Sequence, residues 1–216
     1  MVDIQVRYAI KDDAEVCARL IYMTMGTMAD YLMGNDETAE AINILEQLFR
    51  REKNRYSYQY TNLAIIDGEI AGLLLSYPGR ILKLLDLPMM GSIIAVNELP
   101  EALRFFVRSI PLMMVKEVEV DEYFINNVAV LPNFRRRGVG KLLMNLAEKL
   151  AKESGLNKCA LTVEINNEPA VKLYQQLGYQ IVGTVKVEKL ERKISFEGLY
   201  RMVKVLAENT TSNTRN

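Results

Sequence analysis

A turn rich in arginine and glycine is the segment whose residue types and spacing point most directly to chemistry. An apolar run precedes it and an amphipathic run follows it, which predicts a strand, a turn and a helix in that order. The N-terminus of a helix presents backbone N–H groups without intrahelical partners, and the helix dipole adds partial positive charge there. Glycines lack a Cβ and let a bulky anion approach the backbone. We therefore predict that a phosphate or pyrophosphate binds the N–H groups of about residues 136–141. The turn contains, in order, Arg135, Arg136, Arg137, Gly138, Val139, Gly140 and Lys141.

A solvated basic loop is the alternative interpretation of this turn. The strand before the turn, the helix after it and the arginines between them favour the anion site. Two familiar phosphate-binding loops do not fit the sequence. The turn lacks the Gly-Lys-Ser/Thr ending of a P-loop and the third glycine of a dinucleotide fingerprint.

Two sequence blocks in this chain resemble one enzyme family. Arg135-x-x-Gly138-x-Gly140 is similar to the acyl-CoA signature of the GNAT N-acetyltransferases, Gln/Arg-x-x-Gly-x-Gly/Ala. Residues 167–174, followed by Leu177-Gly178-Tyr179, resemble the family's Asn-x-x-Ala-x-x-Leu-Tyr…Gly-Phe/Tyr block. The blocks stand in the family's order and spacing, and the strong resemblance covers about residues 123–182.

The resemblance implies a fold, a cosubstrate and a reaction. The fold is an α/β (α+β) arrangement with a central mixed sheet, mostly antiparallel and twisted, that has one parallel strand pair and flanking helices. The cosubstrate is acetyl-CoA, and the reaction is transfer of its acetyl group to a primary amine of a small molecule or peptide. The amine attacks directly in a ternary complex.

The resemblance also implies where acetyl-CoA binds. Its pyrophosphate lies on the turn, and its peptide-like pantetheine arm pairs with the edge of the preceding strand. Asn167 contacts the same arm or, equally well, only caps the helix that follows it. The implied cofactor-binding residues are Val128, Ala129, Val130, Arg135, Arg136, Arg137, Gly138, Val139, Gly140, Lys141 and Asn167.

Candidate acid and base residues follow from the resemblance and from composition. Tyr174 occupies the family's position for the general acid that protonates the leaving thiolate; its alternative role is a core aromatic. The chain has no histidine, so a carboxylate acting directly or through water is the natural base for the amine. Strand alternation places Glu122 on the same face as Phe124, Asn126 and Val128. We name Glu122 first and Glu164 second, and a solvated strand carboxylate is the alternative for each.

Composition excludes several other functions. With 216 residues, half of them hydrophobic, and a formal net charge of zero, the chain fits one globular domain. Neither nucleic acid nor an anionic membrane is an expected partner, because no basic face extends beyond the turn. The absence of histidine excludes Ser-His-Asp and Cys-His catalysis, and we expect no metal. Cys17 and Cys159 are expected to be buried structural thiols. The chain shows no signal-peptide pattern, which predicts a cytoplasmic location.

The pattern of apolar residues predicts the remaining elements. Asp12 and Glu15 form a capping box at the start of a helix, and Asp67-Gly68 marks a hairpin. The methionines at positions 23, 25, 28 and 33 are interpreted as core residues or, alternatively, as a flexible acceptor pocket. Residues 1–206 are expected to form one domain, and residues 207–216 a disordered polar tail. The expected elements are a half-buried strand at 4–9, a hairpin at 60–77, a helical insert at 78–112 near the acceptor site or acting as a lid, a strand at 118–131, a helix ending at Gly155, a strand at 158–165, a helix after Asn167, and strands at 179–190 and 198–206.

An alternative function remains open at this stage. The chain is also compatible with a non-catalytic acyl-CoA-binding module that senses the cosubstrate or regulates another protein. The resemblance is compatible with a homodimer, and it identifies neither the amine acceptor nor the base.

Overall fold

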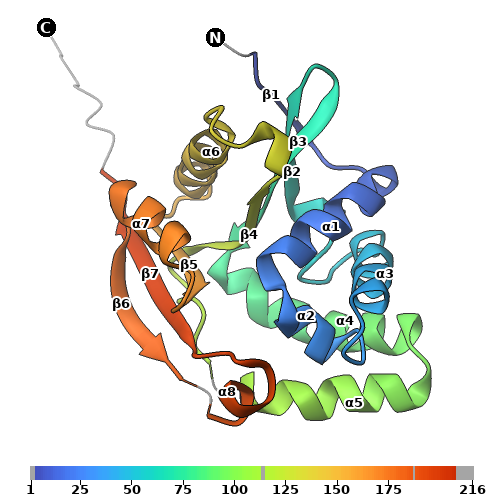
Figure 1. Cartoon of the computed structure of the whole chain (residues 1–216). Coiled ribbons are helices and arrows are strands. Elements are labelled where there is room, and N and C mark those ends of the chain that lie inside the picture. Colours follow the sequence, from blue (N-terminus) through green and yellow to red (C-terminus); the bar gives the residue numbers. More distant parts are fainter. Residues whose placement is uncertain (1–2, 113–114, 187, 208–216) are drawn as a thin grey trace, which may run out of the picture.

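The structure, a computed structural model, describes residues 3–112, 115–186 and 188–207. Within these residues seven strands form one sheet in the order β1-β2-β3-β4-β5-β7-β6. Helices cover both faces of this sheet (Figure 1). The strands are β1 (Gln5–Tyr8), β2 (Thr61–Ile66), β3 (Glu69–Pro78), β4 (Tyr123–Val130), β5 (Lys158–Glu164), β6 (Gln180–Val185) and β7 (Leu199–Val205).

Two apolar clusters fill the space between the sheet and its helices. On one face α1 (Ala14–Met25), α2 (Thr27–Leu32), α3 (Thr38–Phe49) and α4 (Gly79–Val96) cover the first cluster. On the other face α6 (Val139–Glu153) covers the second cluster through Leu143 and Met144. The other helices are α5 (Leu99–Ser109), packed on α2 and α4, α7 (Glu168–Gln176), α8 (Glu188–Ile194), and short 3-10 turns at Lys11–Asp13, Tyr58–Tyr60, Ile110–Leu112 and Pro132–Phe134.

The strand pairing confirms the predicted mixed sheet. β4 and β5 are parallel, with α6 as the connection between them, and the other strand pairs described are antiparallel. The hairpin of β2 and β3 turns at Asp67 and Gly68, whose φ angles are 51° and 81°. Two consecutive positive φ angles are typical of a type I′ turn, which Asp-Gly favours.

A β-bulge at Asn126 changes which side chains of β4 face each side of the sheet. Leu75 pairs with Asn127 but Ser76 pairs with Ile125, so Asn126 is the extra residue. Phe124 belongs to the cluster under α1–α4, whereas Val128 packs against the cluster under α6. The prediction that these residues share one face is therefore wrong, because an inserted residue inverts the alternation beyond it.

Three other expectations are corrected by the structure. The strand predicted at 118–131 begins only at Tyr123, since the backbone turns at residues 119–122. The strand predicted at 179–190 ends at Val185, and α8 follows it. The capping box of Asp12 and Glu15 is replaced by Asp13, whose carboxylate accepts a 2.8 Å hydrogen bond from the N–H of Ile10.

The remaining expectations have mixed outcomes. The insert at 78–112 is helical, as predicted. β1 forms, but as an edge strand its residues are exposed rather than half-buried. Cys17 and Cys159 are both buried and free, as predicted. From residue 208 on, the tail predicted at 207–216 lies outside the described residues. Among the described helices, none is long and apolar enough to cross a membrane.

Candidate active site

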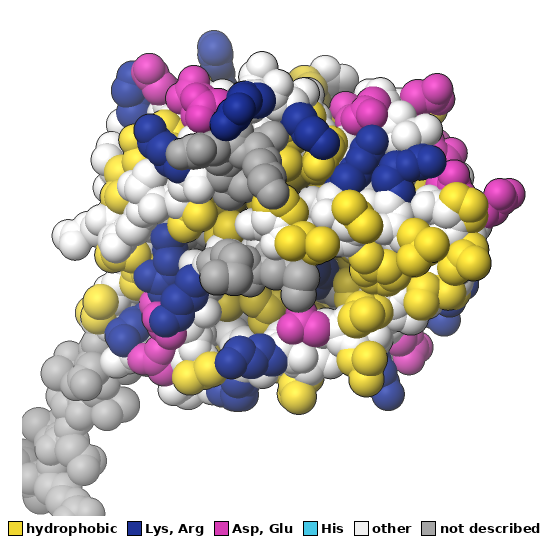
Figure 2. Space-filling model, turned by 90° about the horizontal axis from the view of Figure 1, so that it is seen from below, with side chains coloured by type: hydrophobic (Ala, Val, Ile, Leu, Met, Phe, Trp, Pro, Cys, Tyr) yellow, Lys and Arg dark blue, Asp and Glu magenta, His cyan; other side chains and the backbone are white. Residues whose placement is uncertain are grey.

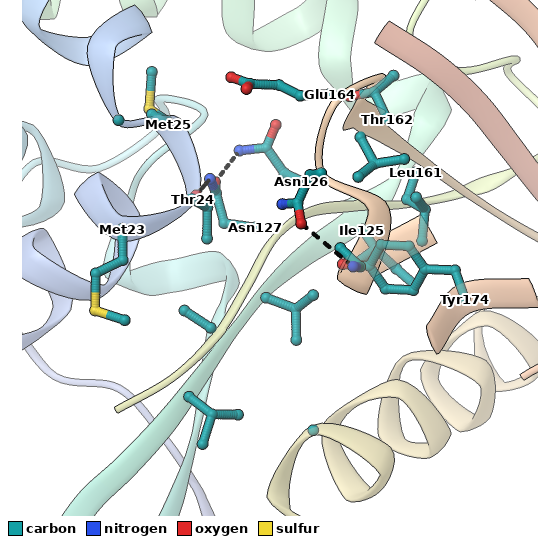
Figure 3. A pocket seen from close by; sticks show the side chains of 18 of the residues that line it. Met23, Thr24, Met25, Ile125, Asn126, Asn127, Leu161, Thr162, Glu164 and Tyr174 are labelled. Atoms are coloured by element: carbon teal, nitrogen blue, oxygen red, sulfur yellow. Dashed lines mark hydrogen bonds between the residues drawn. The ribbon is translucent and has the colours of Figure 1, made fainter. Parts of the chain in front are cut away.

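One cavity of about 780 Å³ lies where β4 and β5 separate. It extends from the end of α1 and the start of α2 to the N-termini of α6 and α7. Figure 3 shows Met23, Thr24 and Met25 on one side of the cavity and Leu161 and Tyr174 on the other, with Asn126 and Asn127 between them. The cavity therefore joins segments that are far apart in the sequence.

The opening between the two strands follows from their short pairing. Only residues 123–125 of β4 pair with β5, at residues 159–161. Beyond the bulge at Asn126, residues 127–130 of β4 pair with β3 alone, and residues 125–130 line the cavity. Unpaired backbone N–H and C=O groups are strong hydrogen-bonding groups. The β5 side of β4 thus offers a strand edge to an extended, amide-containing ligand.

The arginine–glycine turn lies at the C-terminal end of this strand edge. The turn connects β4 to α6, and Gly138 is the N-cap of α6 with a φ of 87°. Arg136 also adopts a positive φ, 61°. α6 packs closely on the sheet because Gly72 of β3 has no side chain. A Cβ there would lie 2.7 Å from the carbonyl oxygen of Ala129 and 3.1 Å from Cγ1 of Val139. The N-terminus of α6 is therefore held next to the end of β4.

Two of the three arginines reach the cavity. Arg135 and Arg136 line it, and Nε of Arg135 donates a 3.4 Å hydrogen bond to the carbonyl of Val130. Arg137 does not line the cavity; its guanidinium lies 5.5 Å from the ring centre of Phe134. The other predicted cofactor-binding residues all line the cavity: Val128, Ala129, Val130, Gly138, Val139, Gly140, Lys141 and Asn167.

Asn167 and Tyr174 come to the cavity from α7. The Asn167 side chain caps this helix by accepting a 3.3 Å hydrogen bond from the N–H of Ala170, and the residue also lines the cavity. Tyr174 is half-buried, with its ring edge-to-face against Tyr179 at 6.2 Å between centroids. Burial raises the pKa of Tyr174 to about 12, so the phenol stays protonated at neutral pH.

The two candidate bases have different surroundings. Glu164, at the end of β5, lines the cavity, and desolvation by burial raises its pKa. Glu122 does not line the cavity and is only 3% exposed. Its carboxylate accepts a 2.8 Å hydrogen bond from the N–H of Glu119 and pairs with Arg201. The structure thus brings Glu164, and not Glu122, to Tyr174 and the strand edge.

Residues that the motifs did not indicate line the other end of the cavity. Met23, Met25 and Met28 lie there, together with an ion pair of Arg55 and Glu117 whose N–O distance is 2.5 Å. The methionine run was the available signal: all three line the cavity, while Met28 also belongs to the buried core and Met25 packs against it. Met33 is buried in the core, as predicted, and does not line the cavity.

Three polar residues that line the cavity at the bulge are connected by hydrogen bonds. Nδ2 of Asn126 donates to Oδ1 of Asn127, and Nδ2 of Asn127 donates to the hydroxyl of Thr24, both at 2.6 Å. Asn126 is the extra residue of the bulge. These hydrogen bonds therefore link the end of α1 to the place where β4 separates from β5.

The model of the "Acetyltransferase (GNAT) family" matches residues 27–179 of this chain. Among curated proteins, "GCN5-related N-acetyltransferase 4, chloroplastic" of Arabidopsis thaliana is 42% identical over 59 residues, which are 27% of this chain and 20% of that protein. The ribosomal protein bS18-alanine N-acetyltransferase of Salmonella typhimurium is 34% identical over 65 residues, which are 30% of this chain and 44% of that protein. The chain thus spans less than half the length of these relatives.

Solved structures show the same fold over nearly the whole chain. An N-acetyltransferase from Staphylococcus aureus Mu50 aligns with a TM-score of 0.69 and 23% identity, covering 92% of this chain and 99% of that chain. An N-acetyltransferase from Thermoplasma acidophilum, solved in complex with coenzyme A, aligns with a TM-score of 0.52 and 15% identity, covering 94% of this chain and 99% of that chain.

The family model covers more than half of the sequence and includes the arginine–glycine turn, the bulged strand and Tyr174. The fold likeness covers the sheet that positions them. The chain therefore belongs to the GNAT family of acetyltransferases.

Proposed function

We propose that this protein transfers the acetyl group of acetyl-CoA to a primary amine by direct attack. The observation that carries the proposal is the continuity of three features in one cavity. The open edge of β4 leads to the N-terminus of α6, and Glu164 and Tyr174 line the same space. This arrangement provides a place for a long, anionic, amide-containing thioester together with an acid and a base.

In this proposal the β4 edge and the turn hold acetyl-CoA. Backbone groups of Val128 and Val130 pair with the pantetheine amides, as a strand pairs with an added peptide. The N–H groups at the start of α6 and the cations of Arg135 and Arg136 hold the pyrophosphate. Asn167, which lines the same cavity, contacts the pantetheine arm.

Glu164 and Tyr174 supply the proton transfers. An alkylamine has a reference pKa of about 10.4 and reaches the site protonated, so Glu164, directly or through water, removes a proton before attack. The amine nitrogen forms a bond to the acetyl carbonyl carbon, and the carbon–sulfur bond breaks. Tyr174, which is protonated, donates to the sulfur as negative charge develops there. The attacking nitrogen then loses its second proton, directly or through water, and this proton restores Tyr174.

The methionine-lined end of the cavity is where the amine enters. Met23, Met25 and Met28 have flexible side chains that adapt to apolar groups of different shape. The acceptor class is a small molecule or a peptide. Peptides with N-terminal alanine belong in a test panel because of the name of the Salmonella relative.

Calorimetric titration with acetyl-CoA, CoA and adenosine diphosphate tests the binding half of the proposal. We expect saturable binding of acetyl-CoA and CoA, and weaker binding of adenosine diphosphate, which has the pyrophosphate but lacks the pantetheine arm. A panel of amines and peptides monitored by release of free thiol then tests the chemistry. Binding without turnover across the panel would favour the non-catalytic module, and no binding by the folded protein would overturn the proposal.

A further inference from the structure

The outer surface of α4 and α5 exposes a row of large apolar side chains on each helix. On α4 these are Leu84, Leu87, Met90 and Ile94, which are 47–76% exposed. Their spacing of three or four residues places them on one side of the helix. Figure 2, which views the molecule from below, shows hydrophobic side chains gathered over the region of these two helices.

The corresponding row of α5 continues into the short turn that follows it. Leu99, Leu103, Val107 and Ile110 are 56–68% exposed and recur every three or four residues. α5 packs against α4, so the two rows form one surface, which we call the α4–α5 face. The apolar side of α5 is only partly buried: Ala102, Phe105 and Phe106 pack against the first apolar cluster, and the adjoining row stays exposed.

Polar anchors hold α5 in this orientation. Arg108 donates hydrogen bonds to the carbonyl of Tyr31 and to Asp36, the latter at 3.2 Å, and its guanidinium lies 4.7 Å from the Tyr31 ring centre. The Arg108 side chain is only 19% exposed, whereas the neighbouring Val107 is 65% exposed. An amphipathic helix normally turns its apolar side inward. The anchored helix therefore leaves the row of Leu99, Leu103, Val107 and Ile110 uncovered by the described residues, as expected of a surface that a partner covers.

The size of the α4–α5 face matches one half of a dimer interface. The largest apolar patch of a typical monomer is about 300–600 Å². From the exposed fractions of the eight side chains, the face presents on the order of 900 Å² of apolar surface, and a standard interface buries about 800 Å² on each partner. One further copy of the same face is therefore sufficient to cover it.

Charge around the face selects among the candidate occupants. Helices that lie on membranes are rich in Lys and Arg on their polar side, but both arginines of α5 are engaged within the chain. Arg104 lies 3.6 Å from Glu101, and Arg108 is anchored to α2. The exposed charged residues of α4 and of the start of α5 are Arg80, Lys83, Asp86 and Glu98, two of each sign. A rim with both signs complements a second copy of itself and offers no net attraction to anionic lipid.

We propose that two copies of this chain dimerise through the α4–α5 face, related by a two-fold axis. In such an interface the same surface serves both partners. The contact lies on α4 and α5, outside the residues that line the cavity. The proposal is thus independent of the acetyltransferase chemistry.

Light scattering coupled to gel filtration tests the proposed dimer. A protein concentration of about 100 µM suits the test, because even the weaker interfaces of this size have dissociation constants in the micromolar range. We expect wild type at twice the 24.6 kDa chain mass. The double variant Leu103→Lys/Val107→Lys should elute at the single mass. Val120→Lys, at a loop position with 60% exposure, should remain at twice the mass.

A second double variant, Leu84→Lys/Leu87→Lys, tests the same face from α4 and serves if the α5 variant does not fold. Circular dichroism and a cooperative thermal unfolding transition establish folding of each variant. Wild type at the single mass, or a folded α4 or α5 variant at twice the mass, would overturn the proposal. Binding of a single-mass wild type to phosphatidylcholine vesicles, lost in the variants, would assign the face to a lipid surface and overturn it equally.

Discussion

Glu122 and Arg201 form a buried ion pair that spans β5. Glu122 lies just before β4, Arg201 lies within β7, and β5 stands between those strands in the sheet. The side chains are 4% and 15% exposed. Nε of Arg201 is buried without a hydrogen-bond partner among the described residues, so the carboxylate is important for compensating the guanidinium charge. The pair therefore links the segment before β4 to β7 across β5.

Replacing Glu122 is expected to reduce stability rather than to alter the chemistry. Removing one partner of a buried ion pair leaves an uncompensated charge, which costs about 3 kcal/mol. We expect Glu122→Gln to lower the free energy of unfolding by about that amount in urea titrations. Asp121→Asn, which removes a neighbouring exposed ion pair with Lys158, should cost much less, because solvent screens that pair. Equal losses in the two variants would contradict this account of the buried pair.

Tyr174→Phe is expected to lower turnover without weakening acetyl-CoA binding. The substitution removes the hydroxyl that donates to the leaving sulfur and leaves the ring packed against Tyr179. General acid catalysis contributes about 10²- to 10⁴-fold, so kcat should fall at least about 100-fold. Tyr179→Phe is the matched variant, because Tyr179 does not line the cavity and its hydroxyl lies beside Cys159 instead. An unchanged kcat in Tyr174→Phe would remove this residue from the mechanism.

Glu164→Gln is expected to slow the reaction while making the fold more stable at neutral pH. Burial raises the pKa of Glu164 above its ordinary value of 4.5, so the folded protein resists ionising this carboxyl. Below about pH 4.5 the carboxyl is protonated in both the folded and the unfolded protein, so it does not change the free energy of unfolding. As pH rises from there through the raised pKa, the unfolded chain loses its proton first, and wild type loses stability relative to the variant.

Two measurements check this prediction. Thermal unfolding from pH 4 to pH 8 should show a stability advantage of Glu164→Gln that grows with pH and then levels off. Turnover of wild type should rise with pH through the same window, because the base works only when it is deprotonated. Glu168→Gln, at an exposed carboxylate on α7, should show neither effect. A variant that is less stable than wild type at pH 8 would show that the carboxylate is not desolvated.

The parts of the site that local sequence determines were predictable. The arginine–glycine turn and the Asn167 cap each depend on residues within a few positions of one another, so a single segment contains the whole signal. The bulge at Asn126 depends on pairing between β3 and β4, about 50 residues apart, and no local pattern indicates it. The partner of Glu122 is likewise 79 residues away. The alternation rule misassigned Val128 because it assumes a regular strand.

Gly138→Asp is expected to weaken acetyl-CoA binding through charge as well as backbone strain. Gly138 has a φ of 87° with open space where a Cβ would lie, so the substitution strains the backbone without a steric clash. Gly155, at the other end of α6, has a φ of 72° and is equally open, which makes Gly155→Asp the matched variant. Both variants should lose similar stability, or Gly138→Asp somewhat less, because a carboxylate is favourable at a helix N-terminus. Only Gly138→Asp places a negative charge where the pyrophosphate is proposed to bind, and we expect its acetyl-CoA dissociation constant by calorimetry to rise by at least about tenfold. Equal affinities in the two variants would show that the pyrophosphate does not bind at the start of α6.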